Sequence, residues 1–187
     1  MEIRNISKCF EEERVLDNIS ISIPKGGRIV ISGASGRGKT TLLRILMGIE
    51  APDSGEIFDA PARFTAVFQE DRLPLEFSAM NCVGMVAPKS VTKAQLAMHL
   101  SELGLDEHMK KPVKELSGGM KRRVAICRAI ICDGDAIYMD EPFTGLDIDT
   151  KKSVIEYINR HCKGRTLVIV SHSAEDAKLL NAKEIRI

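Results

Sequence analysis

Residues 33–40, GASGRGKT, have the types and spacing of a loop that binds phosphate. They fit the pattern G-x-x-x-x-G-K-[ST], in which glycines let the backbone curl around an anion with its N–H groups pointing inward. In such a loop Lys39 reaches the β- and γ-phosphates, and the Thr40 hydroxyl can bind Mg²⁺. The stretch predicts a site for a nucleoside triphosphate. Its expected binding residues are Gly33, Ala34, Ser35, Gly36, Arg37, Gly38, Lys39, Thr40 and Thr41.

Polar residues follow three other apolar stretches of the chain. Asp140 and Glu141 follow AIYM, Gln69 follows FTAVF, and His172 follows TLVIVS. In open α/β sheets, ligands bind beyond the carboxyl ends of the strands. There Asp140 can hold Mg²⁺, Glu141 can polarise an attacking water, and Gln69 can hold the metal or that water. His172 can donate to the γ-phosphate, although a structural histidine is the competing interpretation.

Two residues near these stretches have two interpretations each. Phe10 follows the first expected strand, where an aromatic ring can stack on adenine or pack in the core. Arg37, within the glycine-rich loop, can contact phosphate or extend into solvent. The other histidines, His99, His108 and His161, are interpreted as structural.

A second glycine turn occurs at LSGG, residues 116–119, where it leads into a basic helix. A serine and two glycines at a helix start can donate N–H and O–H groups to an anion. A single nucleotide already has its binding loop at 33–41, so this second site has no phosphate of its own within one chain.

Apolar periodicity predicts the elements that position these residues. Expected strands are 3–10, 15–24, 28–32, 64–69, 136–140, 166–171 and 183–187. Expected helices are 39–49, 91–105, 118–132, 149–162 and 174–181, with turns at 11–14 and 51–55. Strands alternating with helices indicate an α/β fold with a mostly parallel central sheet. The segment 71–132, without a convincing strand, is expected to form an inserted helical subdomain within a single domain.

Composition narrows the classes of protein. The chain has 187 residues, 44% of them apolar, and a formal net charge of +1, which disfavours a nucleic-acid protein with a broad basic surface. Five cysteines without a CxxC pair suggest reduced thiols, several packed as small apolar residues. The amino-terminal stretch lacks the apolar region of a signal peptide, and no run approaches the ~20 apolar residues that span a bilayer. We expect a protein that is soluble by itself.

These motifs together resemble ATP-binding cassette (ABC) ATPases over essentially the whole chain. GASGRGKT, Gln69, LSGGM, AIYMDEP, TGLD at 144–147 and SHS at 171–173 occur in the family's order. The resemblance implies a P-loop core with an amino-terminal antiparallel β-subdomain, and ATP and Mg²⁺ as cofactors. It implies that Phe10 stacks on adenine, and that Thr40, Gln69 and Asp140 hold the metal. Glu141 would be the general base, and His172 the γ-phosphate switch.

The resemblance also gives the second glycine turn a role. In this family two cassettes pair head to tail, and each LSGG loop caps the ATP held by the other. Ser117, Gly118 and Gly119 would donate to the partner's γ-phosphate, and Asp147 would contact the partner cassette. Met120 and Arg122 stand where glutamine is common. The β-subdomain looks trimmed, and no regulatory domain is expected after residue 187.

The segment VFQEDRLPLEFSAMNCV resembles importers for nitrate, sulfonates and taurine. The leading hypothesis is that the chain is the ATPase subunit of a bacterial ABC transporter at the inner face of the cell membrane. An importer is favoured over an exporter. Its partners would be a second cassette, integral membrane permease subunits and an extracytoplasmic substrate-binding protein. Nucleic acid is not expected as a partner. The alternative is a soluble ABC ATPase of a non-transport system such as cofactor assembly. A degenerate, non-hydrolysing cassette is disfavoured by Glu141 and His172.

Overall fold

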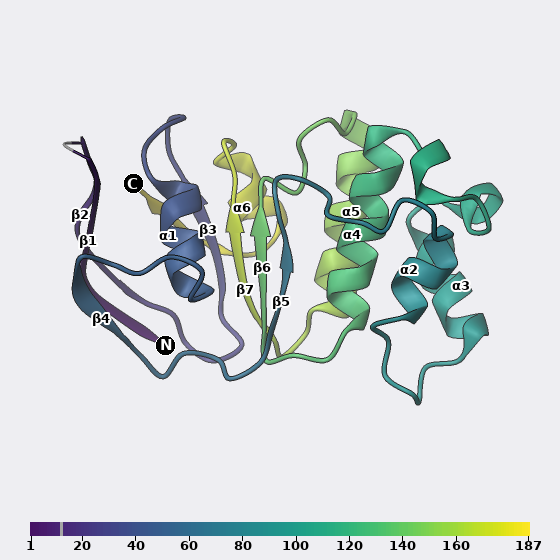
Figure 1. The fold of residues 1–187 in the computed structure, drawn as a ribbon, viewed down its shortest axis with the longest axis horizontal. Coiled ribbons are helices and arrows are strands. Elements are labelled where there is room, and N and C mark those ends of the chain that lie inside the picture. Colours follow the sequence, from purple (N-terminus) through teal and green to yellow (C-terminus); the bar gives the residue numbers. More distant parts are fainter. Residues whose placement is uncertain (12) are drawn as a thin grey trace.

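The computed structural model describes residues 1–11 and 13–187 and contains two sheets (Figure 1). The strands are β1 (Glu2–Phe10), β2 (Glu13–Ser22), β3 (Arg28–Ser32), β4 (Ser54–Phe58), β5 (Phe64–Val67), β6 (Ala136–Asp140), β7 (Thr166–Val170) and β8 (Lys183–Arg186). The α-helices are α1 (Lys39–Leu46), α2 (Ala79–Gly84), α3 (Lys93–Glu102), α4 (Gly118–Ile131), α5 (Ile148–His161) and α6 (Glu175–Leu179). Short 3-10 helices span Asp106–His108 and Val113–Glu115.

The central sheet has the strand order β5-β6-β7-β3-β8, and every neighbouring pair is parallel. The inner strands β3, β6 and β7 are buried on both faces, as their unbroken apolar runs predict, whereas the edge strands β5 and β8 are partly exposed. In β3, Ile29 and Ile31 face the cluster shared with α1, while Val30 faces the cluster shared with α4 and α5. The carboxyl ends of β3, β5, β6 and β7 therefore meet at one edge, and the α/β expectation is confirmed.

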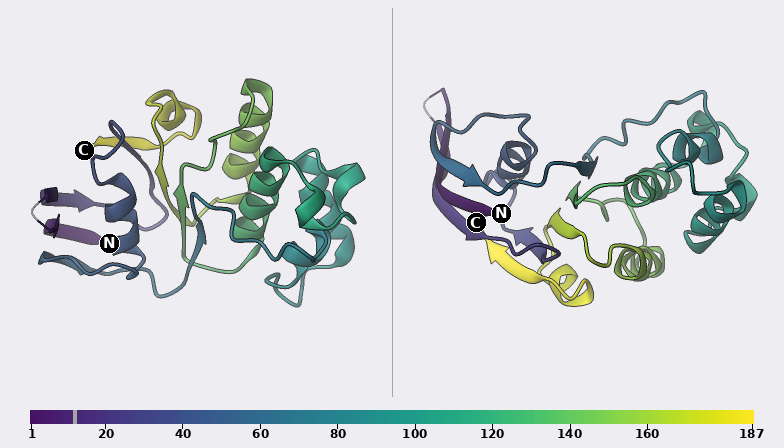
Figure 2. Two further views of the ribbon diagram at one scale, coloured as in Figure 1. Left: turned by 45° about the horizontal axis from the view of Figure 1, so that its top comes forward. Right: turned by 90° about the horizontal axis from the view of Figure 1, so that it is seen from below.

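The second sheet is antiparallel, with the order β2-β1-β4, and it covers α1 (Figure 2). Its pairing is irregular: Asn5, between Ile3 and Ile6, has φ 52° where the register shifts. Strand β4 was not expected from the sequence. SGEIF is short and mostly exposed, so it has no alternating apolar face, and it is a strand because it pairs with β1.

The helical part, with α2 and α3 at the far end of the molecule from the antiparallel sheet, interrupts the core as expected (Figure 1). Within 71–132 the structure has helices and one isolated bridge, Ser78 to Pro112. Thr92 starts α3 with a capping box to Gln95, which explains why this helix begins after the predicted residue 91. Helix α2, at Ala79–Gly84, is too short for periodicity to reveal.

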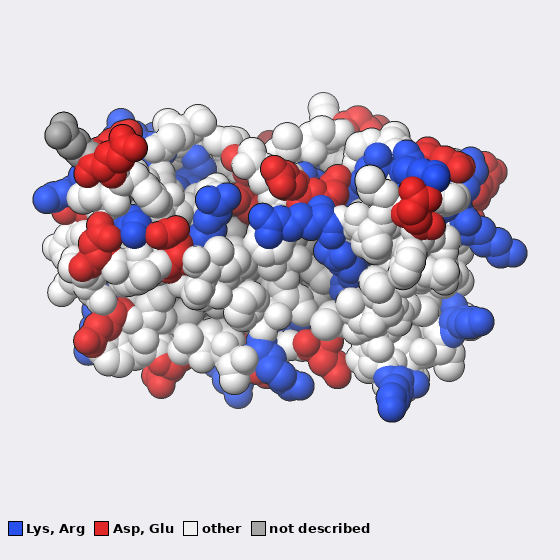
Figure 3. Space-filling model, in the orientation of Figure 1, with Lys and Arg blue, Asp and Glu red and all other residues white. Residues whose placement is uncertain are grey.

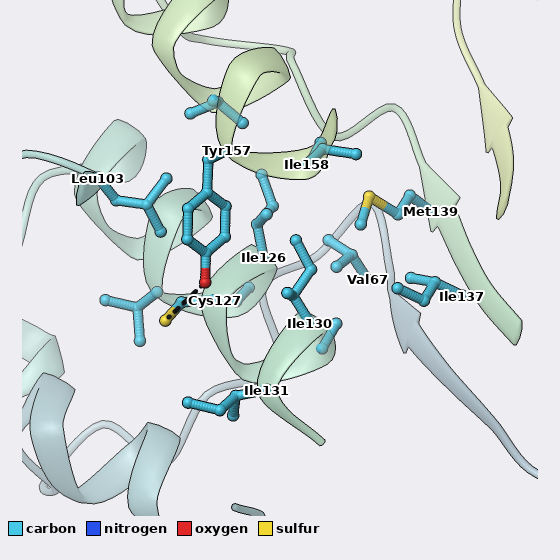
Figure 4. Packing of buried hydrophobic residues seen from close by; sticks show 14 of the residues in the cluster. Val67, Leu103, Ile126, Cys127, Ile130, Ile131, Ile137, Met139, Tyr157 and Ile158 are labelled. Atoms are coloured by element: carbon cyan, nitrogen blue, oxygen red, sulfur yellow. Dashed lines mark hydrogen bonds between the residues drawn. The ribbon is translucent and has the colours of Figure 1, made fainter. Parts of the chain in front are cut away.

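Helices α4 and α5 pack on the opposite face of the central sheet from α1. Figure 4 shows Ile126 and Ile130 of α4 with Val67 and Met139 of the sheet, all buried in one cluster. Tyr157 of α5 is 1% exposed, and its hydroxyl donates to Cys127 Sγ at 3.6 Å. Burial raises the pKa of the Cys127 thiol to about 12, so this cysteine is a packed apolar side chain, as expected.

The remaining expectations concern the turn between the first two strands, the charges on the surface, the cysteines and membrane-spanning helices. The predicted turn 11–14 includes Glu12, which lies outside the described residues; Glu11 is a turn residue and β2 already begins at Glu13. Basic and acidic side chains are interspersed on the face drawn in Figure 3. All five cysteines are free thiols. Among the described residues, no helix combines the length and apolar character needed to cross a bilayer.

Candidate nucleotide-binding site

The glycine-rich loop connects the buried strand β3 to helix α1, the context that the motif requires. Gly38 caps α1 with φ 78°, a left-handed conformation, and a Cβ there would lie 2.6 Å from the Val15 carbonyl oxygen. The close approach of β2 and the backbone angle both require glycine. Helix α1 therefore starts with its N–H groups exposed to the loop, a suitable place for an anion.

Lys39 is 4% exposed, and its ammonium lies within its own loop. Its Nζ donates to the carbonyl oxygens of Gly33 at 2.9 Å and Ala34 at 2.6 Å. A buried ammonium needs such partners, because removing the charge from water is costly. The loop thus holds one fixed positive charge beside the amino end of α1, and both attract phosphate.

Asp140, at the end of β6, meets the loop from the neighbouring strand. Thr40 Oγ1 donates to Asp140 Oδ1 at 3.1 Å. Asp140 is 5% exposed, and this burial is the main reason why the pKa of its carboxyl is raised. The hydrogen bond from Thr40 lowers the pKa and so partly offsets the effect of burial. A hydroxyl and a buried carboxylate are ligands that fit Mg²⁺.

The described residues around Thr40 and Asp140 supply few ligands for a metal. No group of three or more His, Cys, Asp or Glu side chains suited to a metal occurs in the described residues. Mg²⁺ is usually held by one or two carboxylates, with phosphate oxygens and waters completing its shell. The pair of Thr40 and Asp140 therefore fits Mg²⁺ that arrives with a nucleotide.

Glu141 and His172 extend from the ends of adjacent strands and meet. His172 Nε2 lies 2.6 Å from Glu141 Oε1, and Thr144 Oγ1 donates to Glu141 Oε2 at 3.3 Å. Glu141 has φ 47°, an uncommon backbone conformation for a glutamate. The strained turn after β6 aims this carboxylate along the sheet edge, and both of its oxygens have partners.

A cavity of about 220 Å³ brings most of the predicted residues together. Its lining is Val15, Ser35, Gly36, Gly38, Lys39, Thr40, Thr41, Gln69, Glu141 and His172. The cavity combines phosphate-binding N–H groups, a cation, a carboxylate and an imidazole. Sequence reasoning missed Val15, because a single valine on a strand has no functional signature.

Five residues predicted for the nucleotide site lie outside this lining: Phe10, Gly33, Ala34, Arg37 and Asp140. Gly33 and Ala34 accept hydrogen bonds from the Lys39 ammonium and Asp140 accepts one from the Thr40 hydroxyl, so these three adjoin residues of the lining. Phe10 is 44% exposed at the end of β1, with Lys8 Nζ 5.2 Å from its ring centroid. Its interpretation as a core residue is therefore wrong, while adenine stacking stays a prediction. Arg37 is exposed at the loop tip, apart from the cavity lining, so solvation agrees with the structure.

The loop that carries His172 is held by a residue that sequence reasoning missed. Asp176 is 1% exposed; it accepts a hydrogen bond from Ser171 Oγ at 2.5 Å and forms an ion pair with Lys151 of α5. Ser173 N donates to Ser171 Oγ at 3.1 Å. An acidic residue in a short helix looks solvent-exposed in sequence, and only the packing of α5 against this loop reveals its burial.

The second glycine turn lies away from the cavity. Ser117 caps α4, and its hydroxyl oxygen accepts the Met120 N–H at 3.3 Å. Ser117 and Gly118 are exposed, so their donors face solvent. Gly119 lies beside Gly145 and Leu146, whose loop leads to Asp147. Asp147 caps α5, and the Thr150 N–H that it accepts at 2.9 Å lowers the pKa of its carboxyl.

Comparison with known proteins agrees with this geometry. The family described as ABC transporter matches residues 16–144. An aliphatic sulfonates import ATP-binding protein of Pseudomonas syringae pv. tomato is 35% identical, covering 96% of this chain and 67% of its own. A spermidine/putrescine import ATP-binding protein of Mycoplasma capricolum is 32% identical over 95% of this chain, which spans about half, 55%, of that relative's length.

A solved structure shows the same fold. It is a dimer of the ATP-binding cassette MJ0796 in a post-hydrolysis state, bound to ADP and Pi. The TM-score is 0.80 at 24% identity, with 95% of this chain and 90% of that chain covered. The order of the motifs, the fold and the family match agree, and this chain belongs to the ABC transporter family of ATP-binding proteins.

Proposed function

We propose that this chain is a single nucleotide-binding domain that binds and hydrolyses ATP as the energy-supplying subunit of a bacterial ABC importer. The observation that carries the proposal is the cavity in which Lys39, Glu141 and His172 meet. It combines a cation for the phosphates with a carboxylate that a histidine and a threonine hold in place. Phosphoryl transfer from ATP to water needs these groups and little covalent chemistry from the protein.

In the proposed reaction, Glu141 accepts a proton from the water that attacks the γ-phosphorus. The bond from the γ-phosphorus to the bridging oxygen breaks, and ADP and inorganic phosphate leave. Gln69 orients the water, and His172 contacts the γ-phosphate and steadies Glu141 through the 2.6 Å contact. Mg²⁺, held by Thr40, Asp140 and Gln69, would neutralise charge on the phosphates. Phe10 would stack on adenine.

The second glycine turn gives this function its regulation. Ser117 and Gly118 are exposed at the amino end of α4, and they are suited to donate to the γ-phosphate of a second cassette. ATP then joins two chains, and cleavage of its terminal phosphate removes the joint. Asp147, in the loop beside Gly119, would contact the same partner.

The transport role is supported by the relatives' names, which describe import ATP-binding proteins for sulfonates and for spermidine/putrescine. We propose permease subunits in the membrane as the partners, and the cytoplasmic membrane face as the location. An extracytoplasmic binding protein would deliver the substrate. The two relatives act on chemically different compounds, a sulfonate and a polyamine, and the substrate of this system is read by its other subunits.

Glu141→Gln tests the chemistry. Without the general base, phosphate release should fall about 100-fold or more, while ATP binding remains and an ATP-bound dimer accumulates. Phosphate release and light scattering measure both effects, with the exposed Glu156→Gln of α5 as the control. Unchanged hydrolysis in Glu141→Gln would remove this residue from the role of base.

The transport role has its own test. The tagged chain is purified from detergent-solubilised membranes of its native cell, and its companions are identified by mass spectrometry. An integral membrane protein that changes the ATPase rate when reconstituted supports the proposal. Soluble companions alone would favour an assembly ATPase instead.

A further inference from the structure

Arg122, one of the residues that departs from the family's usual glutamine, makes contacts that the proposed mechanism has not used. It lies in the second turn of α4, five residues after Ser117, and is only 7% exposed. A guanidinium is rarely buried without several partners, because its desolvation is costly. Its partners therefore indicate what the residue does.

All three partners belong to the segment that follows β5. Arg122 Nη1 donates to the Phe68 carbonyl oxygen at 2.6 Å, and Nη2 donates to the Gln69 carbonyl oxygen. Its Nε lies 3.2 Å from Asp71 Oδ1. That oxygen has no hydrogen-bond partner in the described part of the chain, so this third contact is an ion pair. The planar guanidinium thus fixes the main chain on both sides of the Gln69 Cα.

The carboxyl-terminal half of α4 also contacts β5, the strand that precedes Gln69. Ile126 and Ile130 pack beside Val67, the last residue of β5 (Figure 4). Thr65 Oγ1 of β5 donates to the Ala129 carbonyl oxygen at 2.7 Å. Arg122 extends this attachment beyond the strand end, toward the amino end of α4.

We propose that Arg122 is a positioning residue that couples Gln69, in the chain's own nucleotide cavity, to Ser117, which caps the nucleotide of a second copy. The proposal rests on the proposed function, because it needs two cassettes that share ATP. Gln69 lines the cavity, and its carbonyl oxygen accepts a hydrogen bond from Arg122 of α4. A shift of Gln69 toward the metal and the γ-phosphate would therefore move α4, the helix that Ser117 caps.

Arg122→Met tests the coupling, with Arg128→Met as the matched control. Arg128 lies on the same helix and donates to the Arg72 carbonyl oxygen at 3.1 Å, in the same loop but beyond Gln69. We expect Arg122→Met to lower kcat about 30-fold, with the Kd for ATP changed less than about threefold. Arg128→Met should change kcat less than about threefold. Equal effects of the two variants would reduce Arg122 to a general loop anchor.

A readout besides turnover separates positioning from plain stability. In the Glu141→Gln background, Arg122→Met should raise the ATP concentration needed for half-maximal dimer by about tenfold. A structural residue would lower Tm and leave that midpoint unchanged. In a Gln69→Ala background, the effect of Arg122→Met on kcat should nearly vanish, because both substitutions break one pathway. Full additivity would overturn the proposal.

Conservative variants decide the question even if Arg122→Met does not fold. Arg122→Gln keeps amide donors for a carbonyl but loses the charge beside Asp71, whereas Arg122→Lys keeps the charge but loses the planar pair of donors. We expect Gln to retain more activity than Lys. A fully active Arg122→Lys would show that the two carbonyl contacts are dispensable. A wild type that does not hydrolyse ATP would instead refute the proposed function itself.

Discussion

The two glycine-rich turns, 33–38 and 116–119, both lie at the amino end of a helix, yet their surroundings differ. The first adjoins a cavity of about 220 Å³, which is also lined by a residue of β2 and by residues that follow the ends of β5, β6 and β7. In the second, Ser117 and Gly118 are exposed, and Gly119 lies beside the loop that leads to Asp147. If the proposed function is right, one chain surrounds the phosphates at the first turn, whereas the donors of the second turn would bind a ligand held by another molecule.

The contrast shows that a helix amino end alone does not make a nucleotide site. The first turn has Lys39, Asp140 and Glu141 around it, so the positive charge, the proposed metal ligand and the proposed base are in one place. The second has only Ser117 and backbone N–H groups to offer. Such an arrangement would suit regulation, because in the proposed function its contribution depends on a second copy of the chain.

Breaking the first turn should have the largest effect. Lys39→Ala removes the cation that binds the phosphates, so we expect ATP hydrolysis to fall about 10³-fold and ATP affinity to fall about tenfold or more. Phosphate release and equilibrium binding measure this, with Lys163→Ala, at an exposed position, as the control. A variant that retains wild-type affinity would contradict the assignment of the cavity.

Breaking the second turn should separate binding from turnover. Ser117→Arg places a bulky side chain where the partner's γ-phosphate would lie, so hydrolysis should fall about 100-fold or more. ATP binding by the isolated chain should stay within about threefold. Thr92→Arg is the matched control, because Thr92 is also an exposed helix cap with a 3.3 Å bond. If ATP binding collapses along with turnover, the second turn does not act across two chains.

The smallest effect concerns the stability cost of the first site. Burial raises the folded-state pKa of Asp140, so its contribution to the free energy of unfolding is largest at acid pH and is lost as pH rises through that pKa. Asp140→Asn keeps the acceptor for Thr40 without the charge.

We therefore expect the ligand-free Asp140→Asn chain to gain about 1 kcal/mol at pH 7.5 while losing hydrolysis, since active sites often cost stability. Urea unfolding between about pH 4.5 and 7.5 measures the difference, which should shrink toward acid pH. Glu156→Gln controls for removal of an exposed charge. A difference that stays constant with pH would exclude the buried carboxylate as its source.

Several features could be predicted from the sequence because they depend on neighbouring residues. The apolar run of β3 and the glycine and lysine spacing of 33–41 predict a loop between a buried strand and a helix. The apolar runs of β6 and β7 predict two more buried strands. Parallel strands place their carboxyl ends together, so Gln69, Glu141 and His172 were expected near the loop, and they line its cavity. Strand β4 and helix α2 were not predicted from the sequence. Strand β4 is mostly exposed, and α2 is a short helix whose position depends on its neighbours.

The sequence by itself determined the local chemistry of this protein: which residues can bind phosphate, which can hold a proton, and which turns start helices. Only the tertiary structure decided the strand order β5-β6-β7-β3-β8, the contact between Glu141 and His172, and the burial of Asp176 and Arg122. Those features depend on contacts between residues far apart in the chain. Periodicity and spacing report on a residue's near neighbours, whereas burial and pairing depend on which distant elements pack together.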